Sequence, residues 1–190
     1  YDIFKSSINI TYPTLSDKIE KQYANASSNN LSNEFNSDAV YGFNTRVKTP
    51  SSVRGVHLDT YDKLYIGLYY MKNLDDKTNG GDLIIYNWKK NINFSEKKKI
   101  LYTEKFKYLD RHTEEYKKIK YDRNTLFLGL HTINSLHGVS TREQSNYIRQ
   151  FCYLSSRIKN GEVISRSSLF EKLNYDNISM FGKLKIVVYE

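Results

Sequence analysis

Four short runs rich in aromatic and β-branched residues most constrain how this chain can fold. Runs of this composition are typical of β-strands, and polar, turn-forming stretches separate them. They span residues 64–71, 80–86 (entered through the pair Gly80-Gly81), 124–128 and 147–154. Hydrophobic residues make up only 39% of the chain, but 17 tyrosines and 9 phenylalanines supply large apolar areas for a core. The residues therefore predict an all-β core with little helix, which by itself indicates only a generic antiparallel sandwich.

A His-x-Asp pair precedes the first of these runs, and another histidine precedes the last. His57 and Asp59 lie two residues apart, so on one strand both side chains would point to the same face. His137 is the distant residue that can complete a three-ligand site. Two histidines and one carboxylate on one side of a metal form the facial site of non-haem iron enzymes, which leaves other positions open. The pattern favours an iron site suited to oxidation chemistry.

The two remaining histidines are given no ligand role. His112 lies among charged residues and is expected to be exposed to solvent. His131 lies six residues before His137 and is expected to be a loop residue near the mouth of the site.

Arg149 lies inside the last strand-like run, on the same predicted face as Tyr147, Phe151 and Tyr153. A charge among apolar neighbours needs a partner, and a bound dicarboxylate would supply one. Arg142 is the alternative candidate for this role. It lies in a polar turn, however, where a solvated loop charge or a substrate contact is expected.

These elements, in this order, resemble the Fe(II)/2-oxoglutarate-dependent dioxygenases, and among them the prolyl-hydroxylase-like branch. The resemblance covers about residues 50 to 157 and rests on His57-Leu58-Asp59, Leu68-Tyr69-Tyr70, Gly80-Gly81-Asp82-Leu83, His137 and Arg149. The chain departs from the family pattern at one place, because Arg149 follows His137 by 12 residues, more than in many relatives.

The resemblance implies a double-stranded β-helix, the cupin-like jelly roll, with flanking helices around the all-β core. It implies that His57, Asp59 and His137 bind Fe(II) and form the catalytic centre, and that Arg149 and Tyr70 bind the far carboxylate of 2-oxoglutarate. A guanidinium suits this role because its planar fork pairs with a carboxylate and stays charged when desolvated. The implied activity is hydroxylation of an unactivated C–H bond of an unidentified substrate by dioxygen. Succinate and CO2 would be released, and ascorbate would be a supporting reductant.

Two other classes of function stay open. A non-catalytic cupin-like module could bind a metal without turnover, which the intact triad and Arg149 disfavour. A metal-dependent hydrolase or isomerase on a similar barrel could also use three protein ligands, but it would not require an arginine inside the last core strand. Consumption of 2-oxoglutarate coupled to release of succinate would separate the three classes.

The length of 190 residues predicts a single domain. We expect residues 1–49 to form an N-terminal support or lid, about 50–157 to form the core, and 158–190 to complete the fold. Within the ends we expect a short helix at 14–23, a loop at 26–38, a helical turn at 170–173 and a strand at 184–189. The polar stretch 89–120 is expected to be an insertion outside the barrel.

The formal net charge of +8 raises the question of an anionic partner. The segment 89–120 contains Lys97-Lys98-Lys99 but no glycine–aromatic pattern of an RNA-binding module, so nucleic acid is not expected. A solvated surface is the simpler interpretation, and attraction of an anionic substrate is the alternative. The single cysteine, Cys152, is predicted to be a buried thiol. No apolar run is long enough to span a bilayer and no signal-peptide pattern is present, so a cytoplasmic setting is expected.

Overall fold

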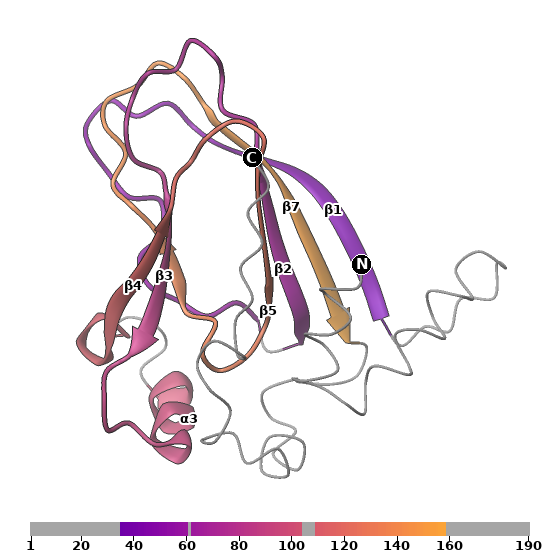
Figure 1. Ribbon diagram of the computed structural model, residues 1–190, viewed down its shortest axis with the longest axis vertical. Coiled ribbons are helices and arrows are strands. Elements are labelled where there is room, and N and C mark those ends of the chain that lie inside the picture. Colours follow the sequence, from indigo (N-terminus) through magenta and orange to yellow (C-terminus); the bar gives the residue numbers. More distant parts are fainter. Residues whose placement is uncertain (1–34, 61, 104–108, 159–190) are drawn as a thin grey trace, which may run out of the picture.

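A computed structural model describes residues 35–60, 62–103 and 109–158 of the chain. Within these ranges the chain forms two antiparallel sheets and one α-helix, which lies at one end of the sheets (Figure 1). The larger sheet has the strand order β1-β7-β2-β5, and the smaller has the order β4-β3-β6. The elements are β1 (Phe35–Asn44), β2 (Lys63–Tyr70), β3 (Leu83–Trp88), α3 (Phe94–Thr103), the 3-10 helix η1 (Leu109–His112), β4 (Thr113–Ile119), β5 (Thr125–Leu130), β6 (His137–Val139) and β7 (Arg149–Ile158).

The predicted all-β core is confirmed, and the four predicted strand runs correspond to β2, β3, β5 and β7. The prediction of a loop at 26–38 is wrong for residues 35–38, because these residues begin β1 and pair with β7. Cys152 on β7 is half-buried rather than fully buried. The helices predicted at 14–23 and 170–173, the strand at 184–189 and the rest of the predicted loop lie outside the described residues.

The segment 89–120 is more than a polar insertion, because β4 within it pairs with β3 along most of that strand. Only Thr113 and Ile119, at the two ends of β4, are buried, and the five residues between them are exposed. This strand therefore lacks the alternation of apolar and polar residues that marks a strand with one buried face. Its place at the edge of the smaller sheet explains the exposure.

Helix α3 begins with a reciprocal pair of hydrogen bonds between Asn93 and Glu96. The side chain of Asn93 accepts a bond from the backbone N–H of Glu96 at 3.0 Å, and the Glu96 carboxylate accepts one from the backbone N–H of Asn93 at 2.9 Å. This capping box fixes the start of the helix. Two of the three consecutive lysines on α3 are half-buried, with Lys97 donating to Asn134 at 3.4 Å and Lys98 lying 5.8 Å from the Phe94 ring.

The core has two parts. One part packs α3 and η1 against the ends of the sheets and contains Leu58, Leu64, Trp88, Leu101, Leu109, Leu130, Ile133 and Leu136. The other fills the space between the two sheets and contains Ile66, Tyr70, Leu83, Ile85, Ile119, Tyr121 and Phe127. Because the second group draws on strands of both sheets, the sheets pack face to face.

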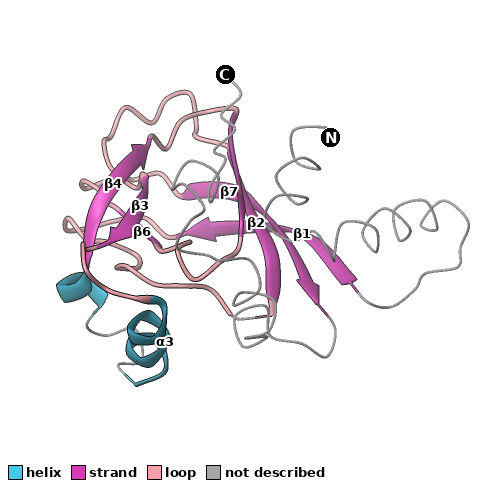
Figure 2. Cartoon of the chain, turned by 60° about the horizontal axis from the view of Figure 1, so that its bottom comes forward, coloured by secondary structure: helices cyan, strands magenta, loops and turns pink. Residues whose placement is uncertain are grey.

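Strand β6 lies beside β3 in Figure 2. The long connection between β1 and β2 extends the smaller sheet beyond β6. Residues 47–57 run antiparallel to 137–145 and meet them at three isolated bridges, Val47–Ser145, Ser51–Arg142 and His57–His137. The connection thus brings the His-x-Asp pair next to the second histidine.

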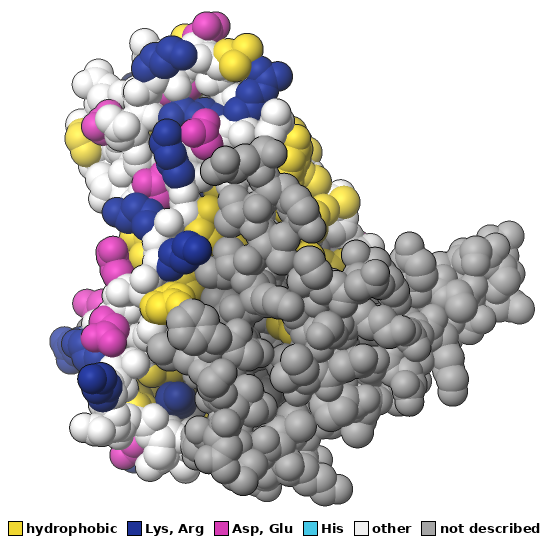
Figure 3. All heavy atoms as spheres, viewed as in Figure 1, with side chains coloured by type: hydrophobic (Ala, Val, Ile, Leu, Met, Phe, Trp, Pro, Cys, Tyr) yellow, Lys and Arg dark blue, Asp and Glu magenta, His cyan; other side chains and the backbone are white. Residues whose placement is uncertain are grey.

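One face of the molecule carries charges of both signs. In Figure 3, lysine and arginine side chains lie among aspartates and glutamates rather than in one block of a single sign. No helix in the part of the chain that the structure describes is long and apolar enough to cross a membrane.

The turn that enters β3 depends on a glycine. Gly80 has a φ of 81°, and a Cβ at this position would overlap the carbonyl oxygen of Thr141. We expect Gly80→Ala to lower the free energy of unfolding by about 2–4 kcal/mol, because both the backbone conformation and the neighbouring chain oppose a side chain. Urea unfolding would measure the loss. Gly55→Ala is the matched control, since a Cβ there meets nothing within 4 Å, and an equal loss in both variants would contradict this explanation.

Candidate metal centre

Two backbone hydrogen bonds join His57 to His137. The N–H of His57 donates to the carbonyl of His137 at 2.8 Å, and the N–H of His137 donates to the carbonyl of His57 at 2.9 Å. Residues that exchange both bonds in this way lie directly opposite each other with their side chains on one face. The two imidazole rings accordingly lie 4.3 Å apart between centroids. Gly138 allows the two segments to approach closely, because a Cβ there would come 3.0 Å from the backbone of Gly55 and press on it.

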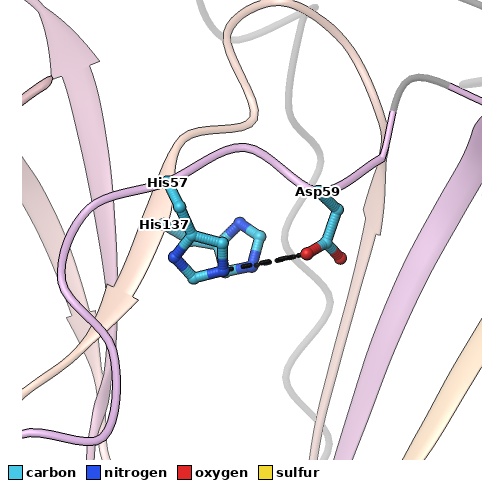
Figure 4. Close-up of side chains that lie close together, drawn as sticks. All are labelled: His57, Asp59 and His137. Carbon is cyan, nitrogen blue, oxygen red and sulfur yellow. Dashed lines mark ion pairs between the residues drawn. The ribbon is translucent and has the colours of Figure 1, made fainter. Parts of the chain in front are cut away.

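Asp59 completes the group from the same side. Leu58 points away into the core under α3, and the next side chain returns toward the histidines. The Oδ1 atom of Asp59 lies 3.7 Å from Nε2 of His57 and 3.9 Å from Nε2 of His137 (Figure 4). The prediction that His57 and Asp59 share a face is confirmed. The expectation that they lie on a regular strand is wrong, because only His57 pairs, and it does so in an isolated bridge.

The backbone fixes which nitrogen of each histidine is free. The Nδ1 atom of His57 lies 2.8 Å from the carbonyl oxygen of Gly55, and that of His137 lies 2.9 Å from the carbonyl oxygen of Ser135. A carbonyl only accepts hydrogen bonds, so Nδ1 carries the proton in both rings. The lone pair is then on Nε2, which faces Asp59. Metal-binding histidines are commonly oriented by such a bond from the other ring nitrogen.

The second oxygen of Asp59 is held by two donors, the buried Lys63 and the half-buried Tyr153. Tyr153 donates to Oδ2 at 2.9 Å and Lys63 donates to it at 3.1 Å, and these two side chains also contact each other. Burial by itself would raise the pKa of Asp59, but attraction to His137 and Lys63 and the bond from Tyr153 lower it well below its ordinary value. Asp59 is therefore a carboxylate at neutral pH.

The histidines near this carboxylate are neutral at physiological pH. Burial is the main cause that lowers the pKa of His57 to about 3, and repulsion from His137 adds to it. Burial likewise lowers the pKa of His137. The prediction that His131 lies at the mouth of the site is wrong, because its side chain is fully buried, which lowers its pKa to about 4. His112 ends η1 and is half-buried rather than exposed.

These three side chains could hold a metal ion. One donor atom from each lies within 4.8 Å of the others, and two neutral imidazoles with one carboxylate suit divalent iron and several neighbouring transition metals. Three protein ligands leave the remaining coordination positions to molecules from outside. The group thus fits a metal centre open to exogenous ligands.

Arg149 and Tyr70 meet in the core between the sheets. Arg149 is buried; its Nε donates to the carbonyl of Gly81 at 2.8 Å and its Nη1 to the side chain of Asn44 at 3.2 Å. Its guanidinium lies 4.9 Å from the Tyr70 ring. Burial raises the pKa of Tyr70 to about 12, so the hydroxyl keeps its proton. Nη2 of Arg149 and Oη of Tyr70 are both buried without a hydrogen-bond partner.

The expectation that Arg142 is a solvated loop charge or a substrate contact is wrong. Arg142 is only 2% exposed, and its guanidinium donates to the backbone carbonyls of Thr45 at 2.9 Å and Tyr147 at 3.0 Å. It therefore ties the chain after β1 to the chain before β7. The polar, turn-like sequence around Arg142 did not indicate that the segments at Thr45 and Tyr147 would cover its side chain.

A small cavity lies between the two sheets and reaches the metal-ligand group. It is lined mainly by apolar side chains and has His137 at its border; the lining residues are Ile66, Ile85, Phe127, Gly129, Leu130, Ser135 and His137. Ile66 and Phe127 belong to the same part of the core as Tyr70. The cavity thus borders both the candidate metal centre and the core that holds Arg149 and Tyr70.

Sequence reasoning missed Lys63 and Tyr153 as members of the site. Lys63 follows Asp59 by four residues, and Tyr153 shares a strand face with Arg149. The predicted face of β7 did place Tyr153 with Arg149. Nothing in the sequence, however, indicated that β7 would pass next to Asp59.

Comparisons with protein-family models, with curated proteins and with solved structures give no match.

Removing any one of the three donors should abolish tight binding of a divalent metal. We expect this for His57→Ala, Asp59→Ala and His137→Ala, because two protein ligands do not define a facial site. Calorimetric titration with Fe(II) under nitrogen measures the affinity. His112→Ala is the control and should bind like the unchanged protein. Normal affinity in any of the three variants would remove that residue from the ligand set.

The metal-free protein should lose stability as the pH falls below 6.5. His57 and His131 have pKa values of about 3 and about 4 in the folded chain and about 6.5 when unfolded. The unfolded chain therefore binds more protons below pH 6.5, so protons favour unfolding. Between pH 6.5 and 5 we expect a loss on the order of 2 kcal/mol for each of these histidines.

Urea unfolding at several pH values in the presence of a chelator measures this dependence. The pKa of Asp59 is also lowered, but its contribution to stability is lost only below its unfolded pKa of 3.8, so it is nearly constant in this window. A His57→Gln variant should show a shallower fall in stability between pH 6.5 and 5. The same slope in the variant and the unchanged protein would show that His57 accepts a proton without unfolding.

Proposed function

We propose that this chain is an Fe(II)- and 2-oxoglutarate-dependent dioxygenase that hydroxylates an unactivated C–H bond of an organic substrate. The observation that carries the proposal is that Nη2 of Arg149 and Oη of Tyr70 are buried without a hydrogen-bond partner, in a core group whose cavity reaches His137. Buried polar groups in native proteins nearly always have a partner. Nη2 of Arg149 needs an acceptor and the Tyr70 hydroxyl can donate to one, so a single carboxylate would satisfy both groups.

Strand β7 connects the two ends of the proposed site. Arg149 and Tyr153 share one face of this strand and lie four residues apart. Tyr153 holds Asp59, so β7 links the proposed carboxylate-binding end to the proposed metal end. Phe151 lies between them, with its ring 5.1 Å from the Arg149 guanidinium. Such a site would bind one acid group at the metal and another at Arg149.

In this proposal His57, Asp59 and His137 hold Fe(II), and Arg149 and Tyr70 bind the far carboxylate of 2-oxoglutarate. The bound iron and 2-oxoglutarate would together activate dioxygen for attack on the substrate. The side chains of this chain would orient the ligands and exclude water. The Nδ1–carbonyl bonds keep both Nε2 atoms directed toward the metal position, and the apolar lining of the cavity keeps water away.

We further propose that the two sheets form the double-stranded β-helix of this family. Supporting this are the face-to-face packing of two antiparallel sheets and the position of the metal-ligand group at one end of the core between them. The pairing of residues 47–57 with 137–145 also lengthens the smaller sheet, as closure of such a fold would require.

The two alternative classes of function give no role to the buried Arg149. A hydrolase or isomerase needs the three donors and a water but gives no role to Nη2 of Arg149 and Oη of Tyr70. A non-catalytic metal-binding module likewise leaves them without an acceptor. Oxygen-dependent conversion of 2-oxoglutarate to succinate, measured with Fe(II) and ascorbate, tests the proposal directly. Metal binding without any such conversion would favour the other two classes.

Loss of the Arg149 side chain should raise the 2-oxoglutarate requirement steeply. In Arg149→Ala, loss of a charge-assisted contact costs about 2–4 kcal/mol, which corresponds to a roughly thirty- to thousandfold higher concentration for half-maximal turnover. Tyr70→Phe keeps the ring and loses one donor, so we expect a smaller rise of roughly five- to tenfold.

Titration of 2-oxoglutarate against succinate formation measures both effects. Tyr69→Phe is the matched control, because the Tyr69 hydroxyl bonds to Asn124 at 2.9 Å at an exposed position. Arg142→Lys should lower the free energy of unfolding with little change in the 2-oxoglutarate requirement, because Arg142 contacts backbone carbonyls. An unchanged requirement in Arg149→Ala would show that the acid binds elsewhere.

A further inference from the structure

The two oxygens of Asp59 have different partners. Oδ1 faces the Nε2 atoms of His57 and His137 at 3.7 and 3.9 Å, and the guanidinium of Arg54, whose side chain is exposed, lies 3.8 Å from it. Oδ2 accepts hydrogen bonds from Tyr153 at 2.9 Å and from Lys63 at 3.1 Å. Two donors on one oxygen leave the other as the oxygen available to a metal ion.

Lys63 is an unusual neighbour for a metal ligand. Its side chain is only 8% exposed, its ammonium group pairs with Asp59, and it lies 4.5 Å from the centre of the Tyr153 ring. Buried cations need a paired charge, and Asp59 supplies it. The same carboxylate is thus shared between a lysine on one side and the metal position on the other.

We propose that Tyr153 and Lys63 are positioning residues that hold Asp59 as a one-oxygen metal ligand, and that the charge of Lys63 also weakens metal binding. The proposal rests on the metal site of the proposed function. Tyr153 orients the carboxylate without adding charge. Lys63 orients it as well, but its positive charge partly neutralises the carboxylate and repels a dication. Both residues therefore orient the Asp59 carboxylate. Tyr153 strengthens metal binding by doing so, whereas the charge of Lys63 weakens it.

The test is a titration of the full chain with Co(II) alone, without 2-oxoglutarate. Tyr153→Phe removes one oriented hydrogen bond, and we expect roughly 10- to 100-fold weaker binding. Lys63→Met removes the charge at similar side-chain length while Tyr153 still holds Oδ2. We expect Co(II) to bind at least about tenfold more tightly, which is the repulsion of a cation and a dication about 6 Å apart even at the dielectric constant of water.

The visible absorption spectrum of bound Co(II) reports how many oxygens coordinate. Each single variant keeps one donor on Oδ2 and should retain the spectrum of the unchanged protein. The double variant Lys63→Met/Tyr153→Phe frees Oδ2, so Asp59 can chelate with both oxygens and the spectrum should change. An unchanged spectrum in the folded double variant would overturn the positioning role.

A purely structural role predicts a different result, because both single variants would then weaken binding. Weaker binding in Lys63→Met would therefore overturn the proposed effect of the charge. Tyr69→Phe serves as the control on the neighbouring strand and should change neither affinity nor spectrum. Circular dichroism and urea unfolding confirm that each variant is folded, and Tyr153→Phe with Lys63→Gln tests the same proposal should Lys63→Met fail to fold.

The outcome separates this inference from the proposed function. If Co(II) binding depends on His57 and His137 but not on Tyr153 or Lys63, only the positioning proposal fails. If the variants behave as expected while 2-oxoglutarate is never consumed, only the dioxygenase assignment fails. Absence of Co(II) binding to the unchanged protein would overturn both.

Discussion

The pair of backbone hydrogen bonds between His57 and His137 is the contact on which the rest of the site depends. It joins the long connection after β1 to the short strand β6, so two segments 80 residues apart in the sequence become neighbours. Once this pair is formed, the alternation of side chains turns both imidazoles and the carboxylate of Asp59 to one side. The metal-ligand geometry is thus a consequence of backbone pairing, and the small size of Gly138 permits it.

Burial makes this geometry costly for the chain without a metal. The site packs neutral histidines against a buried carboxylate and a buried lysine. Each of these groups gives up its hydrogen bonds to water when the chain folds. The Asp59–Lys63 pair satisfies the charges of both partners, so the folded chain tolerates the site before a metal binds. A metal would then share the carboxylate with Lys63, and this competition sets how strongly the site retains its ion.

The sequence predicted the four strands with strong aromatic and branched content, because these are buried on at least one face. It also predicted which side chains gather in the metal-ligand group, because the residue types and the two-residue spacing carry that information. It did not predict β1, β4 or β6. These strands lie at sheet edges, and β4 has exposed side chains along most of its length, so backbone pairing rather than side-chain pattern defines them.

Other features depend on contacts between distant segments and leave no local pattern. Arg142 lies in a polar turn, yet it is buried because the chain near Thr45 and Tyr147 folds over it. Lys63 resembles any charged residue at the start of a strand, and its burial follows from the approach of Tyr153 on β7. Because β7 presents Arg149 and Tyr153 on one face, the same strand sets the position of the Arg149 guanidinium, whose Nη2 has no hydrogen-bond partner, and of the Asp59 carboxylate. A one-residue slip of β7 against β2 would turn both to the opposite face, so the register of this pair controls both ends of the proposed site together.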